Sequence, residues 1–300
     1  MPESYIDIKS ISELHEFYGV GKPRHPLITV IELGSNKVNR LEQNAIYRLG
    51  FYTIFCKKFS GTLKYGRSYY DFSEGSLMFT GPGQIVSPSP EQYLDEGWGL
   101  FFHPDLVNTG ALGRKMGDYS FFNYEANEAL HVSEEEKSVL TTCVQNIRKE
   151  YMQNIDKHTT RLIQANIELL LNYCSRFYDR QFYTREKVNT DVVQQFEKLV
   201  KDYFAPETLI DTGLPNVGYF ASRMNLSPNY LSDLLHRFTG KTTQEHIHLQ
   251  LVDKAKSLLL STQKSVSEIA YTLGFEHPSH FTRLFKSKTG YAPSDYRHPN

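Results

Sequence analysis

The sequence predicts an α+β protein in which a β-barrel domain precedes an all-α domain. Three observations predict this division. Residues 1–130 are rich in aromatic and β-branched residues interrupted by glycine and proline, a pattern typical of short strands joined by turns. From Ser133 onward, apolar residues recur every three or four positions, as on amphipathic helices. Near the C-terminus, one layout of helix, tight turn and helix occurs twice.

Composition bounds the class of protein and its compartment. The 300 residues, 40% hydrophobic and 22% charged, are enough for about two domains. No apolar run is long enough to cross a bilayer, and the opening residues MPESYIDIKS lack the pattern of a secretory signal. Cys56, Cys143 and Cys174 are odd in number and widely spaced, which favours reduced thiols over a disulfide framework or a zinc cluster. We therefore expect a cytoplasmic protein with no membrane partner.

The β domain is predicted from short apolar runs bounded by turn residues. The runs are 28–33, 46–55, 61–65 and 76–79. Short, evenly spaced strands favour a closed sandwich or barrel, and a cupin-like jelly roll fits the pattern. The histidines of this half lack the closely spaced pair that a metal-dependent cupin uses. They are His15, His25, His103 and His131. We expect no catalytic residues, no metal and no other cofactor.

Four aromatic side chains of the β domain are candidates for an effector pocket, because small-molecule pockets are lined mainly by apolar and aromatic groups. They are Tyr52, Tyr65, Tyr69 and Trp98. The alternative is that each fills the core of the barrel. The first interpretation implies that the domain senses a small molecule.

Residues 131–180 are predicted to be helical. Ser133 and Glu136 form the pattern of a capping box, which begins the first helix. The next helix, 159–178, carries two apolar stripes and therefore needs two partners. One stripe contains Ile163, Ile167 and Leu170, and it predicts either a two-fold interface with a second subunit or packing within the chain. Residues 181–190 are polar and charged, which predicts a linker before the last domain, 191–300.

The last domain contains the repeated layout. In its second copy, Ser265 and Glu268 predict a capping box, and Gly274 permits the left-handed turn that ends the first helix. In its first copy, the second helix begins at Pro228 and ends at Gly240. A continuous helix over 242–262 joins the copies. Its length of roughly 31 Å is close to the ~34 Å between successive major-groove openings.

The residues of the second copy resemble the C-terminal signature of the AraC/XylS-type transcriptional regulators. The matching positions are Ile269, Ala270, Leu273, Gly274, Phe275, Phe281, Arg283, Phe285, Lys286, Gly290, Pro293, Tyr296 and Arg297. The resemblance extends over about the last 110 residues. It implies a sequence-specific regulator of the activator type that binds double-stranded DNA and RNA polymerase. It also implies an N-terminal domain that senses a small molecule or forms a homodimer.

The resemblance assigns base-reading positions on both outward-facing helices. They are Asn229, Ser232 and Asp233 in the first, and Pro278, Ser279, Thr282 and Arg283 in the second. Two of these depart from what DNA reading favours. Asp233 is repelled by phosphate, although it can accept from cytosine N4, and Pro278 has no backbone donor. Three further cations, Arg237, Lys286 and Lys288, are interpreted as phosphate contacts.

The overall charge does not favour nucleic acid, because the formal net charge is −1. From Thr190 onward, 12 Lys and Arg stand against 11 Asp and Glu, so any charge facing DNA must be local. Two alternatives to a DNA-binding regulator therefore stay open. One is a metal-dependent cupin-type enzyme, and the other is a protein-interaction module with a degenerate helix-turn-helix.

Overall fold

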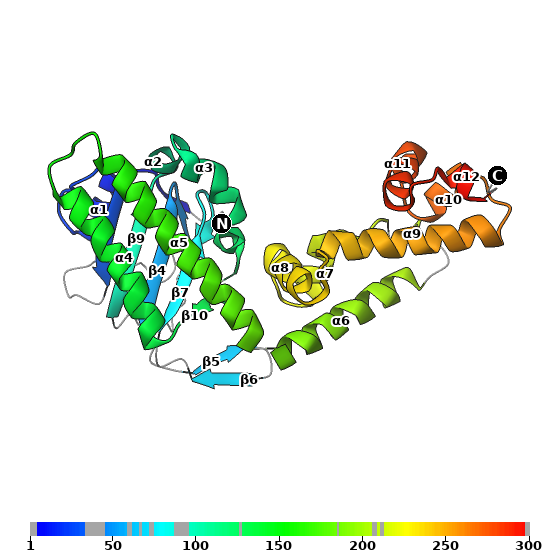
Figure 1. Cartoon of the computed structure of the whole chain (residues 1–300), viewed down its shortest axis with the longest axis horizontal. Coiled ribbons are helices and arrows are strands. Elements are labelled where there is room, and N and C mark those ends of the chain that lie inside the picture. The colour runs from blue at the N-terminus through cyan, green and yellow to red at the C-terminus, as the bar shows by residue number, and fades with distance from the viewer. Residues whose placement is uncertain are drawn as a thin grey trace. The chain divides into compact units, whose positions relative to one another are not determined.

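The computed structural model contains two compact units, Met1–Thr184 and Arg185–Asn300 (Figure 1). It describes residues 5–33, 46–58, 62–65, 68–71, 75–86, 96–125, 128–184, 186–205, 209–210 and 213–297. The first unit combines helices with sheets, and the second is all-helical. Within those residues, no helix has both the length and the apolar character needed to span a bilayer.

The main sheet of the first unit has five strands in the order β10-β7-β4-β9-β2, and every neighbouring pair is antiparallel. The strands are β2 (Ile28–Leu33), β4 (Tyr52–Lys58), β7 (Ser76–Thr80), β9 (Glu96–Phe102) and β10 (Leu130–His131). In the register, Phe101 of β9 lies opposite Thr29 on one side and Thr53 on the other. Three consecutive residues of β9, Leu100, Phe101 and Phe102, are each 0% exposed, so this central strand is buried on both faces.

Smaller strands complete the first unit. A three-stranded sheet has the order β1-β3-β8, and β5 pairs with β6 as a separate hairpin. The bounds are β1 (Tyr5–Ile8), β3 (Ile46–Leu49), β5 (Thr62–Tyr65), β6 (Ser68–Asp71) and β8 (Ile85–Val86). The strands that the structure describes do not close into a barrel. The expectation of a closed cupin-like barrel is therefore not met by the described strands.

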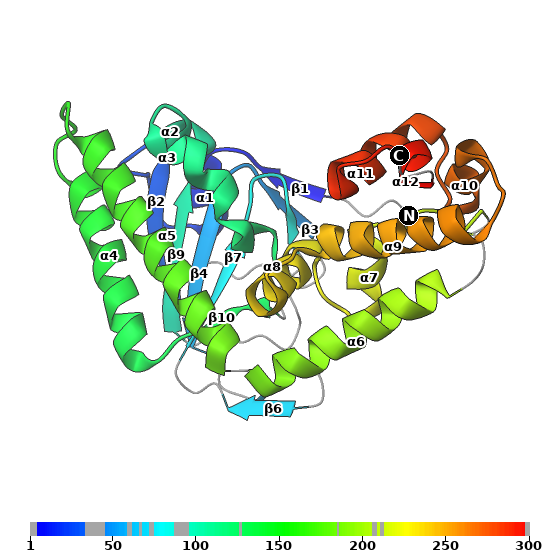
Figure 2. The same ribbon diagram turned by 45° about the vertical axis from the view of Figure 1, so that its right-hand side comes forward.

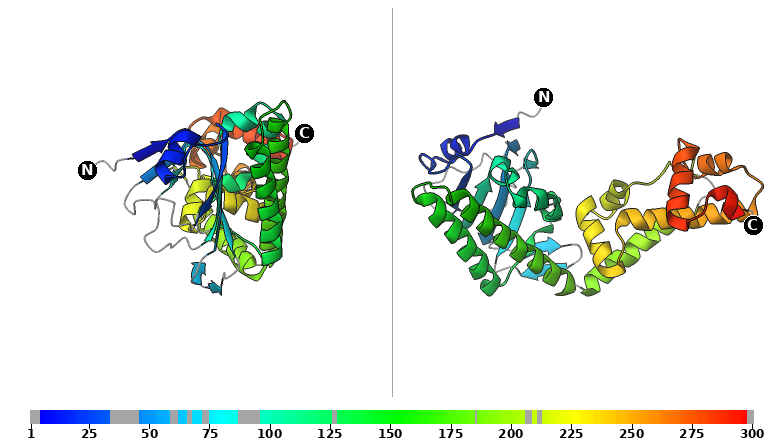
Figure 3. Two further views of the ribbon diagram at one scale, coloured as in Figure 1. Left: turned by 90° about the vertical axis from the view of Figure 1, so that its left-hand side faces the viewer. Right: turned by 45° about the horizontal axis from the view of Figure 1, so that its top comes forward.

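Helices cover one face of the main sheet, and α1 together with strands β1 and β3 of the small sheet packs against the other. Helices α4 (Glu134–Met152) and α5 (Thr159–Thr184) lie side by side on one face, and α1 (Ile11–Tyr18) lies on the other (Figures 2 and 3). The backbone N–H of Val30 donates to the Tyr151 hydroxyl at 3.1 Å, which joins α4 to β2. Alternating apolar residues predict a strand, but they do not specify whether a sheet or a helix covers its apolar face.

The predicted capping box at the start of α4 is present. Ser133 Oγ accepts from the N–H of Glu136 at 3.2 Å, and Glu136 Oε2 accepts from the N–H of Ser133 at 3.1 Å. Short helices α2 (Pro104–Asn108) and α3 (Ala111–Lys115) and two 3-10 turns, η1 (Met116–Asp118) and η2 (Ser120–Asn123), connect β9 to β10.

The residues expected to form a linker, 181–190, belong mostly to the end of α5 and the start of α6 (Glu186–Phe204). Gln181 explains why a polar stretch is ordered there. It is 1% exposed, its side-chain oxygen accepts from the N–H of His131 at 2.8 Å, and its amide donates to the carbonyl of Ala129 at 3.2 Å. A polar side chain that satisfies buried backbone groups looks, in the sequence alone, like a solvent-exposed one.

The second unit is built around the long helix α9 (Thr243–Ser261), with helices grouped at its two ends (Figures 1 and 3). Helices α7 (Val217–Arg223) and α8 (Pro228–Thr239) pack near its first residues. Helices α10 (Val266–Thr272), α11 (Pro278–Thr289) and α12 (Pro293–Arg297) follow it. The core residues shared by these helices include Phe196, Phe220, Leu235, Leu251 and Phe285.

Candidate nucleic-acid interface

The pairs α7–α8 and α10–α11 are two helix-turn-helix units. Their second helices, α8 and α11, are fifty residues apart, whereas their first helices, α7 and α10, are forty-nine apart. Helices α8 and α11 both begin at a proline, Pro228 and Pro278, and both end before a glycine in the left-handed region. Those glycines are Gly240, with φ of 71°, and Gly290, with φ of 83°. The predicted internal repeat is therefore present in the structure.

The C-terminal ends of α8 and α11 are also capped by equivalent threonine hydrogen bonds. Thr239 Oγ1 donates to the carbonyl of Leu235 at 2.7 Å and accepts from the N–H of Lys241 at 3.2 Å. Thr289 Oγ1 donates to the carbonyl of Phe285 at 2.8 Å and accepts from the N–H of Tyr291 at 3.2 Å. The fifty-residue register therefore relates individual positions of the two units.

The turn inside each unit needs a residue in the left-handed region. In the second unit this is Gly274, with φ of 83°, and in the first it is Asn225, with φ of 53°. Asparagine tolerates this region better than most side chains. A Cβ on Gly274 would lie 2.9 Å from the carbonyl carbon of Gly213 and 3.1 Å from the oxygen of Leu209. At Gly274, glycine therefore meets two requirements, the backbone angle and the close approach of the segment that precedes α7.

Hydrogen bonds at the first residues of α7 and α10 begin each unit. Asn216 Oδ1 accepts from the N–H of Tyr219 at 2.8 Å. Ser265 Oγ accepts from the N–H of Glu268 at 3.2 Å, and Glu268 Oε2 accepts from the N–H of Ser265 at 2.6 Å. The capping box predicted at Ser265 is therefore formed.

Helix α11 exposes one polar face. Phe281 and Phe285 are buried on its inner side, whereas Ser279, Arg283 and Lys286 are exposed. Those three residues have the spacing i, i+4 and i+7, so they lie on one face with Arg283 in the middle. The predicted base-reading arginine therefore occupies the centre of an exposed surface.

Two other predicted contacts of α11 lie off the centre of this face. Thr282 is half-buried. Lys288 is exposed, and its positive charge acts on α9, where it contributes to lowering the pKa of Glu245. The larger causes of that lowered pKa are hydrogen bonds from the backbone and side chain of Thr242. Lys288 follows Arg283 by five residues, so it lies off the centre of the face that Arg283 occupies.

Helix α8 exposes the equivalent face with different chemistry. Asn229, Asp233 and His236 have the same i, i+4 and i+7 spacing; the first two are half-buried and His236 is exposed, as is Arg237. Ser232 lies at the edge of this face, because its Oγ accepts from the N–H of Thr243 at 3.3 Å at the start of α9. Of the three base-reading positions predicted on α8, Ser232 is thus already used within the protein.

Helix α9 joins the two units and begins at a capping box. Thr242 Oγ1 accepts from the N–H of Glu245 at 3.3 Å, and Glu245 Oε2 accepts from the N–H of Thr242 at 2.8 Å. The helix has 19 residues, which corresponds to about 28 Å. The predicted joining helix is therefore present and slightly shorter than expected.

Comparison with known proteins agrees with this geometry. Residues 220–298 match a family model described as a helix-turn-helix domain. YijO, an uncharacterized HTH-type transcriptional regulator of Escherichia coli K12, is 25% identical over 232 residues, which cover 75% of this chain and 78% of YijO. RhaS, an HTH-type transcriptional activator of Salmonella paratyphi B, is 30% identical over 134 residues, which cover 44% of this chain and 46% of RhaS. Residues 220–298 therefore form an AraC-type helix-turn-helix domain, and the relatives of the chain are transcriptional regulators.

A solved structure is also similar to the C-terminal part of this AraC-type chain. The DNA-binding domain of the global transcriptional factor AdpA, in complex with a target DNA, is 23% identical, with a TM-score of 0.30. The match covers 36% of this chain and 88% of that domain. The function of the family is transcription regulation through a DNA-binding helix-turn-helix domain, and the relatives are regulators rather than enzymes.

The aromatic residues predicted for an effector pocket divide into two groups. Tyr52 stacks on Phe102 with ring centroids 5.1 Å apart, and burial raises its pKa. Trp98 is buried, and its Nε1 donates to Thr141 Oγ1 at 3.3 Å. Both side chains therefore pack in the AraC-type regulator's first unit. The side chains of Tyr65 and Tyr69 lie outside the described part of the chain.

The residues predicted for dimerisation need a correction. Ile163, Ile167 and Leu170 are all 0% exposed, because they pack inside the first unit. The side chains that remain exposed on α5 belong to the other stripe, with Leu162 at 45% and Leu169 at 46%. The sequence shows two stripes at helical spacing, but only the packing of α5 decides which one the unit covers.

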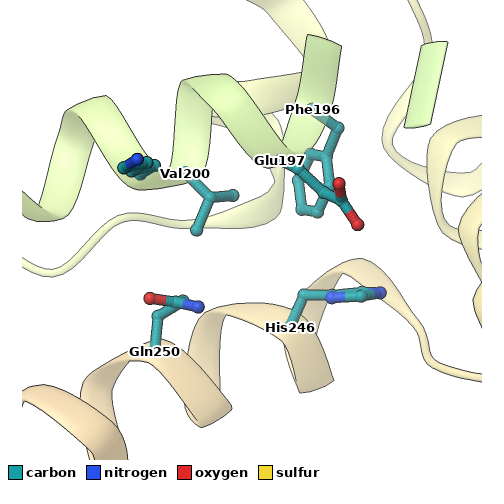
Figure 4. A pocket seen from close by; sticks show the side chains of 6 residues that line it. Phe196, Glu197, Val200, His246 and Gln250 are labelled. Carbon is teal, nitrogen blue, oxygen red and sulfur yellow. The ribbon is translucent and has the colours of Figure 1, made fainter. Parts of the chain in front are cut away.

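A groove between α6 and α9 was not anticipated from the sequence (Figure 4). Its volume is about 400 Å³, and its lining residues are Phe196, Glu197, Val200, Lys201, His246 and Gln250. His246 Nε2 lies 2.8 Å from Thr239 Oγ1, next to the end of α8. Burial lowers the pKa of His246, and Glu197 opposes that effect. The residues come from two helices far apart in sequence, so spacing along the chain does not reveal them.

No group of three or more metal-binding side chains is brought together in the described parts of the chain. Cys56, Cys143 and Cys174 are free and buried. Burial raises the pKa of Cys56 to about 11, so this thiol is protonated at neutral pH.

Proposed function

We propose that this AraC-type regulator reads a specific double-stranded DNA sequence with α8 and α11 and thereby activates transcription. The observation that supports this most is the exposed face of α11, where Arg283 lies between Ser279 and Lys286. A guanidinium is suited to bidentate hydrogen bonds with guanine, and a nearby lysine is suited to phosphate. Asn229 and Asp233 on α8 and Thr282 on α11 are the proposed secondary base contacts.

The proposal includes phosphate contacts on both helices. Arg237 and Lys286 are exposed near the ends of α8 and α11. Lys288 is included because its side chain is exposed in the last turn of α11. Double-stranded DNA as the partner implies a cytoplasmic location. RNA polymerase is the proposed second partner, since the relative RhaS is a transcriptional activator.

Selection and footprinting test this function directly. Full-length protein should enrich a common sequence from a random duplex library at low salt. Nuclease footprinting on that duplex should show protection of about twenty base pairs per monomer, which corresponds to two major grooves and their flanks. The double variant Arg283→Ala, Lys286→Ala is the matched control, and it should lose the footprint. A wild-type protein that enriches no sequence would contradict the proposal and would favour the protein-interaction module.

For the N-terminal unit, Met1–Thr184, we propose effector sensing or dimerisation. The exposed residues Leu162 and Leu169 of α5 support the second role. They lie seven positions apart, on one face of the helix, and exposed apolar side chains at this spacing fit a two-fold contact between like helices. Thermal-shift measurements with sugars and aromatic acids test the first role. A midpoint that rises with ligand concentration would support sensing.

A further inference from the structure

The fifty-residue register pairs a histidine of α8 with a lysine of α11. His236 and Lys286 are both the ninth residue of their helices, and both are exposed. One turn earlier, Asp233 pairs with Arg283 in the same way. Helix α11 therefore presents permanent cations at two positions where α8 presents a carboxylate and an imidazole. Histidine is the side chain whose charge ordinarily changes between pH 5 and 8.

Charged groups lie on the helix of His236 and on the three helices that pack against it, α6, α7 and α9, of which α6 carries Glu197 and Lys201. On its own helix they are Asp233, one turn earlier, and Arg237, the next residue. Across from it on α9 is Glu245, whose pKa His236 helps to lower, after hydrogen bonds from Thr242 and the charge of Lys288. On α7, which also packs against α8, the guanidinium of Arg223 lies 5.0 Å from the centre of the Tyr219 ring of the same helix.

This arrangement matters when DNA approaches. A phosphate brought to the exposed face of α8 meets the carboxylate of Asp233 and the guanidinium of Arg237. An imidazole donates to phosphate most strongly as imidazolium, because the charge-assisted hydrogen bond is about twice as strong as a neutral one. The equivalent phosphate at α11 meets the ammonium of Lys286, and lysine is ordinarily charged throughout this pH range.

We propose that His236 is a phosphate contact of the first helix-turn-helix unit that forms with uptake of a proton. Helix α11 then holds DNA at any pH near neutrality, whereas α8 engages DNA fully only when His236 is protonated. This inference rests on the proposed function. DNA binding by the first helix-turn-helix unit then depends on pH, whereas DNA binding by the second does not change near neutrality.

The test measures the affinity of the full-length protein at several pH values. The probe is a duplex selected from a random library at about pH 6, labelled for fluorescence anisotropy, with ionic strength held constant. The wild-type Kd should rise roughly three- to tenfold from about pH 6 to about pH 8, the range expected for one imidazole that takes up a proton on binding. Footprints at the two pH values should show that protection is lost mainly over one of the two major grooves.

Substitutions of His236 separate this contact from other histidines. His236→Lys should bind at about pH 8 as tightly as wild type does at about pH 6. His236→Gln should bind weakly at every pH. His158→Gln, at an exposed position of the N-terminal unit Met1–Thr184, should keep the wild-type pH dependence. Because His236 is exposed, all three variants are expected to fold, which circular dichroism checks.

Two outcomes would overturn the inference. If His236→Gln keeps the full pH dependence, the proton is taken up elsewhere, with His277 and His280 at the start of α11 as the next residues to replace. If wild-type affinity does not change with pH, no proton is taken up. In both cases a selected duplex is still bound, so the proposed function survives. Absence of any selected duplex at any pH would overturn both proposals.

Discussion

Asp233 and Arg283 occupy the same position in the two helix-turn-helix units, because each is the sixth residue of a helix that begins at proline. A carboxylate can accept from cytosine N4, whereas a guanidinium donates to guanine. The two units therefore present opposite charges at the middle of their exposed faces. We infer that they read different bases and contribute unequally to affinity.

Replacing Arg283 should alter sequence preference. Arg283→Ala is expected to cost about 1–3 kcal/mol at particular base positions, because a bidentate guanine contact is lost. Competition binding against a panel of single-base variants of the selected duplex measures this. Lys286→Ala is the control, and it should weaken all duplexes alike and reduce the salt slope by about 1. A uniform loss in Arg283→Ala would instead make Arg283 a phosphate contact.

Replacing Gly274 should destabilise the second helix-turn-helix unit, α10–α11, more than replacing Gly290 does. Both have φ of 83°, so an alanine at either costs roughly 1–2 kcal/mol of stability. Only Gly274→Ala also brings a Cβ to 2.9 Å from Gly213, whereas Gly290 has open space. Hydrogen exchange of peptides from α10 and α11 reports the difference. Equal protection in the two variants would show that the chain before α7 moves aside at no cost.

The Ser265–Glu268 capping box should make the second unit sensitive to acid. Hydrogen bonds from Ser265 hold the pKa of Glu268 below its ordinary value of 4.5. Because the folded pKa is the lower one, the stabilisation is fully present above about pH 4.5 and is lost as the pH falls through the folded value. Glu268→Gln should lower the unfolding midpoint at pH 7, and its difference from wild type should shrink in acid. Glu276→Gln, at an exposed position outside any helix, should match wild type throughout. A Glu268→Gln difference that does not change with pH would contradict this prediction.

The exposed stripe of α5 predicts how oligomerisation responds to charge. The double variant Leu162→Asp, Leu169→Asp should stay folded and sediment as a monomer if wild type is a dimer, because two acids on each helix repel across a two-fold axis. Ile163→Asp should instead unfold the N-terminal unit, Met1–Thr184, because it buries an unpaired carboxylate. Analytical ultracentrifugation and circular dichroism distinguish the two results. A double variant with the wild-type mass would remove this stripe from any dimer contact.

Local sequence signals predicted many of the helix boundaries in the C-terminal unit, Arg185–Asn300. The capping residue Ser265, the proline Pro228 that begins α8 and the glycine Gly240 that ends it act within a few residues, so their effect can be predicted from the sequence. The exposed position of Arg283 follows in the same way from the spacing of Phe281 and Phe285. The similarity of α8 and α11 can also be predicted from the sequence. The equivalence of His236 and Lys286 follows from it.

Only the tertiary structure decided what depends on contacts between distant segments. It decided that α4 and α5 cover one face of the main sheet, and that α5 buries the stripe of Ile163 rather than that of Leu162. It also decided that the Ser232 hydroxyl faces α9 and that Gln181 is buried beside β10. Periodicity identifies an apolar or polar face, but the partner of that face is chosen by packing among segments far apart in the chain.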